Sequence, residues 1–364
     1  MAAFPLQPEQ LSNEWFTHVL RESGQLGPSN SVSSYDVSYI GDGVGLLGMV
    51  VRVRLSYSSA ESAGPDTVVI KFAHPVAENR AIAMNTNMYE REVTFFNRVA
   101  PSVDVPKPQC WFAEVDPETG GNCVVLEDMV GYRSGDQVSG ASVAEVKMII
   151  DAIVPLHAKF WGKAEGQFPG MMQINTLYIE PFMPGVEGTW QNCIAQFGYC
   201  MTPDVIEAMP RYVAGLRDIM RRNGDRTMTL IHGDVRVDNV MFGDGKPGLA
   251  PVVMLDWQAI MVSNPMQDLA WLLNSGFDTE LRRKHEEEFL ACYCERLASE
   301  GVSGYSLDQA RDDYDMGLLW MLCYPVIIGG AFDPANERGK ALTEVCLRRA
   351  TAAVSDRGLL ARIP

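Results

Sequence analysis

The most informative segment of this 364-residue chain is Leu230-Ile-His-Gly-Asp-Val-Arg-Val-Asp-Asn-Val-Met-Phe242. Within it, Asp234 is followed five residues later by Asn239, and apolar runs lie on both sides. The stretch Val252-Val-Met-Leu-Asp256 then places a second carboxylate at the end of a buried strand. Phosphoryl transfer needs a carboxylate beside the attacking hydroxyl, and oxygen ligands for Mg²⁺ between the phosphates. The spacing therefore indicates a site for phosphoryl transfer.

A turn joins the two halves of this motif. The residues Gly243-Asp-Gly-Lys-Pro-Gly248 lie between apolar runs at 237–242 and 251–256 and predict a β-hairpin. A hairpin would bring Asn239 and Asp256 to one metal, and amide and carboxylate oxygens suit Mg²⁺. An Asp and an Asn that merely cap adjacent turns would explain either motif alone. They do not explain both motifs in this order and spacing.

These motifs resemble the signature of the aminoglycoside phosphotransferase and choline kinase-like enzymes, which are small-molecule relatives of protein kinases. The matching pattern is His232-Gly-Asp-x-x-x-x-Asn239, followed by Asp256-Trp257. The segments LHAKFWG (156–162) and DLAWLL (268–273) look closest to the ecdysteroid kinase-like group. The resemblance spans roughly residues 35 to 300. It implies that Asp234 is the catalytic base and that Asn239 and Asp256 bind Mg²⁺.

The order of elements agrees with the fold that this resemblance implies. A strand-rich first third followed by helices favours an α+β fold over alternating β-α-β units. The expected fold is bilobal and protein kinase-like, with a small β-rich lobe at 1–128, a larger helical lobe at 129–364, and ATP between them. Hydrophobic patterns predict helices at 8–22 and 80–99, and strands at 35–40, 49–55, 67–72 and 122–127.

A glycine-rich turn lies between the predicted strands at 35–40 and 49–55 and precedes the strand that carries Lys71. Gly43-Val-Gly45-Leu-Leu-Gly48-Met-Val50 fits the pattern G-x-G-x-x-G-x-V, whose backbone N–H groups face the phosphates of ATP in kinases. An ordinary glycine-rich hairpin is the alternative interpretation of these residues.

The run Val69-Ile-Lys71-Phe72 resembles the kinase strand whose lysine binds the α- and β-phosphates. In such a lobe the lysine pairs with a glutamate of the next helix, and the family pattern favours Glu92, with Glu90 as the fallback. These two glutamates lie about 200° apart around a helix, so only one of them can face Lys71.

The run Val124-Val-Leu-Glu127-Asp-Met129 resembles the linker between kinase lobes. The resemblance implies that the backbone of Glu127 and Met129 binds adenine, with Leu126 at the back of the pocket. An ordinary strand end is the alternative.

Two departures from protein kinases bear on the substrate. Gly233 stands where protein kinases have an arginine that pairs with a phosphorylated activation loop, and only 11 residues separate Asp256 from Asp268. This is too short for a regulatory loop and a platform for a protein substrate, so a small-molecule acceptor is expected. The resemblance implies that Asp268 supports the catalytic loop through hydrogen bonds. His157, on an apolar helix, is interpreted as a core histidine.

Composition excludes some partners. The chain has 30 Lys and Arg against 46 Asp and Glu, a formal net charge of −16, which argues against binding duplex nucleic acid. Eight scattered cysteines and an N-terminus without a signal-peptide pattern predict a cytoplasmic protein. The charge-free run from Met316 to Phe332 is interrupted by Pro325 and a pair of glycines, which favours a buried helix and turn over a membrane span.

Together these features predict an ATP- and Mg²⁺-dependent phosphotransferase. It would move the γ-phosphoryl group to a hydroxyl of an aminoglycoside-, choline- or steroid-like acceptor. One alternative is a degenerate kinase fold that binds a nucleotide or metabolite without chemistry. Another is a hydrolase that uses the same carboxylates and metal, which would leave the glycine-rich turn and Lys71 without a role.

Overall fold

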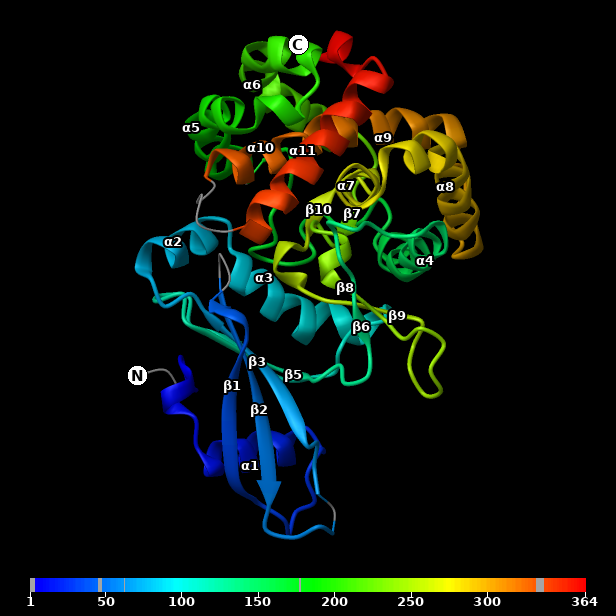
Figure 1. The fold of residues 1–364 in the computed structure, drawn as a ribbon. Coiled ribbons are helices and arrows are strands. Elements are labelled where there is room, and N and C mark those ends of the chain that lie inside the picture. The colour runs from blue at the N-terminus through cyan, green and yellow to red at the C-terminus, as the bar shows by residue number, and fades with distance from the viewer. Residues whose placement is uncertain (1–3, 45–47, 62, 177, 332–336) are drawn as a thin grey trace. The chain divides into compact units, whose positions relative to one another are not determined.

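The computed structural model describes residues 4–44, 48–61, 63–176, 178–331 and 337–364. The chain forms two compact units (Figure 1). The first comprises Met1–Ser102 and Lys107–Gly131, and the second comprises Val103–Pro106 and Tyr132–Pro364.

The first unit is built on a five-stranded antiparallel sheet with the order β1-β2-β3-β5-β4. Buried and exposed side chains alternate along the middle of β2, as expected for a strand with one face on a core. The sequence patterns located four of these strands, and β4 was missed. The strands are β1 (Val32–Val44), β2 (Gly48–Tyr57), β3 (Thr67–Ala73), β4 (Cys110–Val115) and β5 (Asn122–Glu127).

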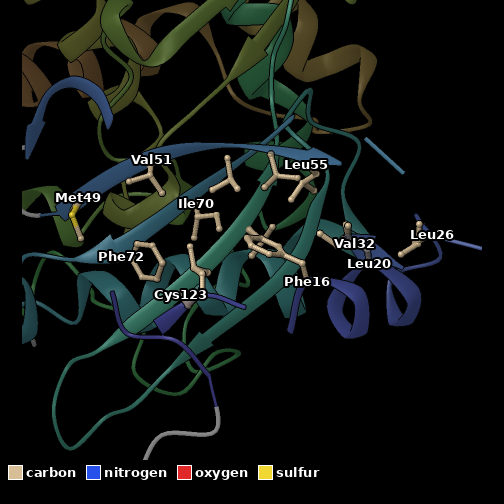
Figure 2. Packing of buried hydrophobic residues seen from close by; sticks show 14 residues of the cluster. Phe16, Leu20, Leu26, Val32, Met49, Val51, Leu55, Ile70, Phe72 and Cys123 are labelled. Carbon is tan, nitrogen blue, oxygen red and sulfur yellow. The ribbon is translucent and has the colours of Figure 1, made fainter. Parts of the chain in front are cut away.

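Helix α1 (Asn13–Glu22) covers one face of this sheet with its apolar side. Phe16 and Leu20 of the helix and Ile70 and Phe72 of the sheet belong to one cluster of buried hydrophobic side chains (Figure 2). The prediction of a helix over 8–22 was wrong in its first turns. Pro8–Gln10 form a separate 3₁₀ turn, and the α-helix begins only after Ser12, whose Oγ accepts the N–H of Trp15 at 3.1 Å.

The predicted helix at 80–99 is interrupted. Helix α2 (Ala77–Asn85) ends before Asn87, whose φ of 51° lies in the left-handed region and breaks the helical path. Helix α3 (Met88–Thr94) then continues into a π-helical turn at Phe95–Val99. The interruption sets the rotation of α3, and therefore which of its glutamates faces the sheet.

The second unit is mainly helical and contains two small sheets (Figure 1). Its helices are α4 (Val143–Lys159), α5 (Ile179–Phe197), α6 (Pro203–Gly224), α7 (Met266–Gly276), α8 (Thr279–Ser299), α9 (Leu307–Met321), α10 (Cys323–Gly330) and α11 (Glu337–Asp356). Its strands are β6 (Arg133–Ser134), β7 (Thr229–Ile231), β8 (Val240–Phe242), β9 (Val252–Met254) and β10 (Met261–Ser263).

The small sheets include both ends of the segment 230–242. The predicted hairpin is present as antiparallel β8 and β9, in which Val240 pairs with Met254. Strand β7 pairs with β10 and ends directly before His232. The charge-free run that starts at Met316 lies in α9 and α10, and no helix in the described parts of the chain is long and apolar enough to cross a membrane.

Candidate active site

Asp234 and Asn239 are joined by hydrogen bonds across one short loop. The amide Nδ2 of Asn239 donates to Asp234 Oδ2 at 2.9 Å and to the Asp234 carbonyl at 3.0 Å. Asn239 is 5% exposed and precedes β8, which fixes its backbone. Because its N–H₂ group is used within the loop, the amide oxygen of Asn239 is left as the atom that can bind a cation.

Asp256 follows β9 with a left-handed backbone, at φ 61° and ψ 68°. A non-glycine residue in this region is strained, by an amount on the order of 1–3 kcal/mol, and such strain is concentrated at functional sites. The Asp256 side chain is partly exposed, and its Oδ2 accepts the amide of Gln258 at 3.3 Å. The Leu255 N–H donates to the Asn239 carbonyl at 2.8 Å, which ties the Asp256 segment to the Asn239 loop.

A buried carboxylate on α7 holds the backbone of the loop. Asp268 is fully buried, and its two oxygens accept the N–H groups of His232 and Gly233, each at 2.8 Å. His157 bonds to the same carboxylate at 3.1 Å and to the hydroxyl of Tyr293 at 2.9 Å. The expectations that Asp268 supports the loop and that His157 is a satisfied core histidine are confirmed.

Gly233 is required by the path of the loop. Its φ is 84°, and a Cβ atom there would overlap the carbonyl oxygen of Ala259. The residue that distinguishes this motif from that of protein kinases is therefore also the one that permits this backbone path.

Two residues at Asp234 were not singled out from the sequence. The indole N–H of Trp271, on α7, donates to Asp234 Oδ1 at 2.8 Å. Arg236 Nε lies 3.2 Å from Asp234 Oδ2. Burial lowers the pKa of Arg236, but the nearby carboxylates, with Asp234 and Asp256 foremost, outweigh burial and raise it. Arg236 lies in the segment 230–242, and Trp271 lies in DLAWLL (268–273). Membership of these two motifs was the sequence signal that could have identified them.

Lys71 and Glu92 form an ion pair in the first unit. Lys71 lies in β3, opposite Val50 of β2, and its Nζ contacts Glu92 Oε1. The side chain of Glu92 is 2% exposed and that of Lys71 is 17% exposed. Glu90 faces elsewhere, and its Oε2 is buried without a hydrogen-bond partner in the described structure. Glu92, and not the fallback Glu90, therefore carries the pair.

The other predicted nucleotide residues lie on the same sheet. Gly43 belongs to β1, Gly48 begins β2, and Gly45 lies outside the described residues. Glu127 ends β5, and its carboxylate accepts the N–H of Gln109 at 3.1 Å.

Met129 lies in the turn after β5, where the neighbouring Val130 N–H donates to the Asp128 carbonyl at 2.7 Å. Asp128 accepts two hydrogen bonds from Arg52 of β2, at 2.7 and 3.0 Å, so this turn is fastened to the sheet.

The sequence matches the ecdysteroid kinase-like family over residues 42–301, which is more than half of the chain. The chain belongs to the ecdysteroid kinase-like family. The matched region contains the loop of Asp234 and Asn239 as well as the ion pair of Lys71 and Glu92, and the suspected relationship is confirmed.

Solved structures show the fold of this family member. Choline kinase from Cryptosporidium parvum is 11% identical, with a TM-score of 0.54, and the match covers 96% of this chain and 98% of that one. A microcompartment-associated aminopropanol kinase is 11% identical, with a TM-score of 0.54, covering 96% and 100% of the two chains. The GDP complex of aminoglycoside 2'-phosphotransferase-IIIa is 12% identical, with a TM-score of 0.53, covering 94% and 99%. The predicted α+β, protein kinase-like fold is thereby confirmed.

The chain also matches part of a longer curated protein. The Caenorhabditis elegans protein named "Uncharacterized oxidoreductase dhs-27" is 23% identical over 332 residues. The match covers 82% of this chain, and the chain spans about two fifths (39%) of the worm protein.

Family and fold together support a small-molecule phosphotransferase in the general sense. The described part of the chain has no group of three or more His, Cys, Asp or Glu side chains that could enclose a metal ion. Asp256 and the Asn239 amide carry oxygen donors on two segments that the Leu255–Asn239 backbone hydrogen bond joins. Such donors suit a cation that also takes oxygens from a substrate, as Mg²⁺ does with phosphates.

Proposed function

We propose that this ecdysteroid kinase-like protein is a small-molecule kinase that transfers the γ-phosphoryl group of Mg-ATP to a hydroxyl of an organic acceptor. The observation that carries the proposal is that the Asp234 carboxylate is held by hydrogen bonds and is still accessible to solvent. Its carboxylate is held on both oxygens by Trp271, Asn239 and Arg236, yet its side chain remains 23% exposed. A fixed and accessible carboxylate of this kind can orient a hydroxyl and accept its proton.

The proposed transfer forms one bond to the γ-phosphorus and breaks another. The acceptor oxygen attacks the γ-phosphorus, the bond from that phosphorus to the β–γ bridging oxygen breaks, and ADP leaves with that oxygen. The hydroxyl proton passes to Asp234. Asn239 and Asp256 would hold Mg²⁺, which supplies positive charge against the phosphate oxygens.

The residues of the first unit would bind the nucleotide. Lys71 would contact the α- and β-phosphates, and the buried Glu92 carboxylate would hold its ammonium group in place. The backbone of Gly43, Gly45 and Gly48 would face the phosphates.

Adenine would bind to the backbone of Glu127 and Met129, with Leu126 behind it. The fastening of Asp128 to Arg52 supports this role, because it fixes the turn that carries these groups.

Three structural neighbours of this fold are named for kinases of choline, of aminopropanol and of aminoglycosides. These acceptors share an alcohol group, and we propose the same reacting group here, on an aminoglycoside-, choline- or steroid-like molecule.

A screen for ADP release tests the proposal. Wild-type protein with Mg-ATP would be assayed against aminoglycosides, choline-like amines, sugars, steroids and hydroxy acids, and phosphorylated products would be identified by mass spectrometry. Asp234→Asn should bind ATP as wild type does while its kcat falls by a factor of about 10² to 10⁴. An Asp234→Asn protein that turns over at the wild-type rate would exclude the assigned base.

The same screen separates the two alternatives. A catalytically degenerate binder would be stabilised by Mg-ATP but would consume none with any acceptor. A hydrolase would release phosphate from phosphorylated compounds without ATP.

A further inference from the structure

Helix α7 presents two functional side chains to the loop that carries Asp234. Asp268 and Trp271 are three residues apart and therefore lie on one face of the helix. Asp268 accepts the backbone N–H groups of His232 and Gly233, while Trp271 reaches the Asp234 carboxylate. One helix face thus fixes both the backbone of the loop and the side chain at its centre.

The hydrogen bonds to Asp234 divide unequally between its two oxygens. Oδ2 accepts Asn239 Nδ2 at 2.9 Å and Arg236 Nε at 3.2 Å, which accounts for both of its lone pairs. Oδ1 accepts the Trp271 indole N–H at 2.8 Å and retains one lone pair. The proton of an acceptor hydroxyl would therefore go to Oδ1, the oxygen that Trp271 holds.

The Trp271 ring is itself held firmly. It is 2% exposed and meets the ring of Tyr324, on α10, edge to face with centroids 5.4 Å apart. Tyr324 in turn packs on Phe182, with centroids 5.8 Å apart, and on Trp320, also at 5.8 Å. A ring enclosed in this way offers its N–H in one direction only.

We propose that Trp271 is a positioning residue for the phosphoryl transfer, an inference that rests on the proposed function. The last torsion of an aspartate side chain is broad, so a carboxylate bonded through one oxygen alone can rotate. Trp271 stops this rotation by holding Oδ1, and it keeps the remaining lone pair of Oδ1 toward the acceptor hydroxyl. It would touch neither the acceptor oxygen nor the γ-phosphorus, and it acts through Asp234.

The test removes the N–H group and keeps the ring as far as the chemistry allows. In Trp271→Phe the donor and part of the ring are lost. Replacement of Trp271 by 3-benzothienylalanine keeps the fused-ring shape and puts sulfur in place of N–H. Both variants should lower kcat for the acceptor about 10- to 100-fold, the effect of one hydrogen bond to a charged group. The KM for ATP should stay unchanged, and the benzothienyl variant should unfold at the wild-type temperature.

The matched control replaces Trp320 by 3-benzothienylalanine. Trp320 is fully buried in the same aromatic cluster, but its indole N–H has no acceptor within the described structure. This replacement keeps the packing of the ring on Tyr324 and removes only the N–H, so kcat and the unfolding temperature should both stay near their wild-type values.

Equal kcat values for the Trp271 and Trp320 variants would overturn the role of Trp271 and leave the proposed function intact. So would a wild-type kcat after replacement of Trp271 by 3-benzothienylalanine. A wild-type protein that releases no ADP with any acceptor would instead overturn the proposed function, and this inference with it.

Discussion

At the scale of single residues, α3 offers a comparison that separates a functional carboxylate from a neighbour of the same type. Glu92 pairs with Lys71, whereas Glu90 does not reach it and has a buried oxygen without a partner in the described structure. Glu92→Gln would leave the Lys71 ammonium without its charged partner, so we expect the KM for ATP to rise about tenfold, the effect of one charged hydrogen bond. Glu90→Gln should keep the wild-type KM. Steady-state kinetics of both variants measure this, and equal effects would contradict the assignment.

Gly233 allows a second comparison between matched residues. Gly233 and Gly245 both have positive φ, 84° and 69°, but a Cβ would collide with a carbonyl only at Gly233 and would meet open space at Gly245. Gly245→Ala should cost only the left-handed strain, about 1–2 kcal/mol of the free energy of unfolding. Gly233→Ala adds the collision, so it should cost more and also lower kcat by displacing Asp234. Denaturant unfolding and kinetics on the two variants check this, and indistinguishable behaviour would show that the loop path is not constrained at Gly233.

The sequence alone identifies those candidate site residues whose spacing along the chain forms a recognisable pattern. Asp234 and Asn239 lie five residues apart on one loop, so a pattern of residue types is enough to name them. The bond from Trp271 to Asp234 joins residues 37 positions apart. It depends on the rotation of α7 and on one side-chain torsion, neither of which a pattern of residue types contains.

At the scale of elements, long patterned segments and the β8–β9 hairpin with its turn signal were predictable, whereas other short or interrupted elements were not. The strands of the first unit's sheet at β2, β3 and β5 have apolar patterns long enough to recognise. Strands β7 and β10 have three residues each and were missed, because so short a run has no periodicity to detect. The break at Asn87 was missed because a left-handed residue other than glycine leaves little trace in composition.

Helix α7 holds the loop that carries Asp234 through the carboxylate of Asp268. Asp268 is fully buried and accepts two backbone N–H groups and one from His157, so all of its bonds point into the loop and the core beneath it. Asp268→Asn turns a donor toward at least one of these N–H groups and removes the charge, which should lower the free energy of unfolding by about 3–5 kcal/mol.

The control for Asp268 is Asp308→Asn. Asp308 pairs with Arg311 three residues along α9, and its side chain is 90% exposed. Exposed pairs contribute about 0.2–1 kcal/mol, so this variant should stay near wild type in urea unfolding and in activity. An Asp268→Asn protein as stable as Asp308→Asn would show that α7 does not hold the loop through this carboxylate.

At the scale of the whole molecule, the net charge of −16 says less about the acceptor than the local charges do. Many carboxylates of the second unit are engaged by arginines: Arg226 pairs with Asp312 and Asp313, and Arg357 with Asp315 and Glu286. Acidic residues bound in this way hold the helices together and do not mark a cationic substrate. In the second unit, the charged side chains of the candidate site are Asp234 and Asp256, and Arg236 contacts Asp234.

The proposed function predicts that nucleotide and metal raise the free energy of unfolding of the chain. A ligand present at about 100 times its Kd adds about 2.7 kcal/mol to the free energy of unfolding, which raises Tm by several degrees in a chain of this size. We expect such a rise with ADP and Mg²⁺, and a smaller one with ADP and EDTA, because the donors of Asn239 and Asp256 act only through the metal. Asn239→Ala and Asp256→Ala should lose the difference between the two conditions, while Lys71→Ala should lose most of the rise in both. Differential scanning calorimetry measures these shifts, and an EDTA-insensitive wild type would refute the assignment of Asn239 and Asp256 as metal ligands.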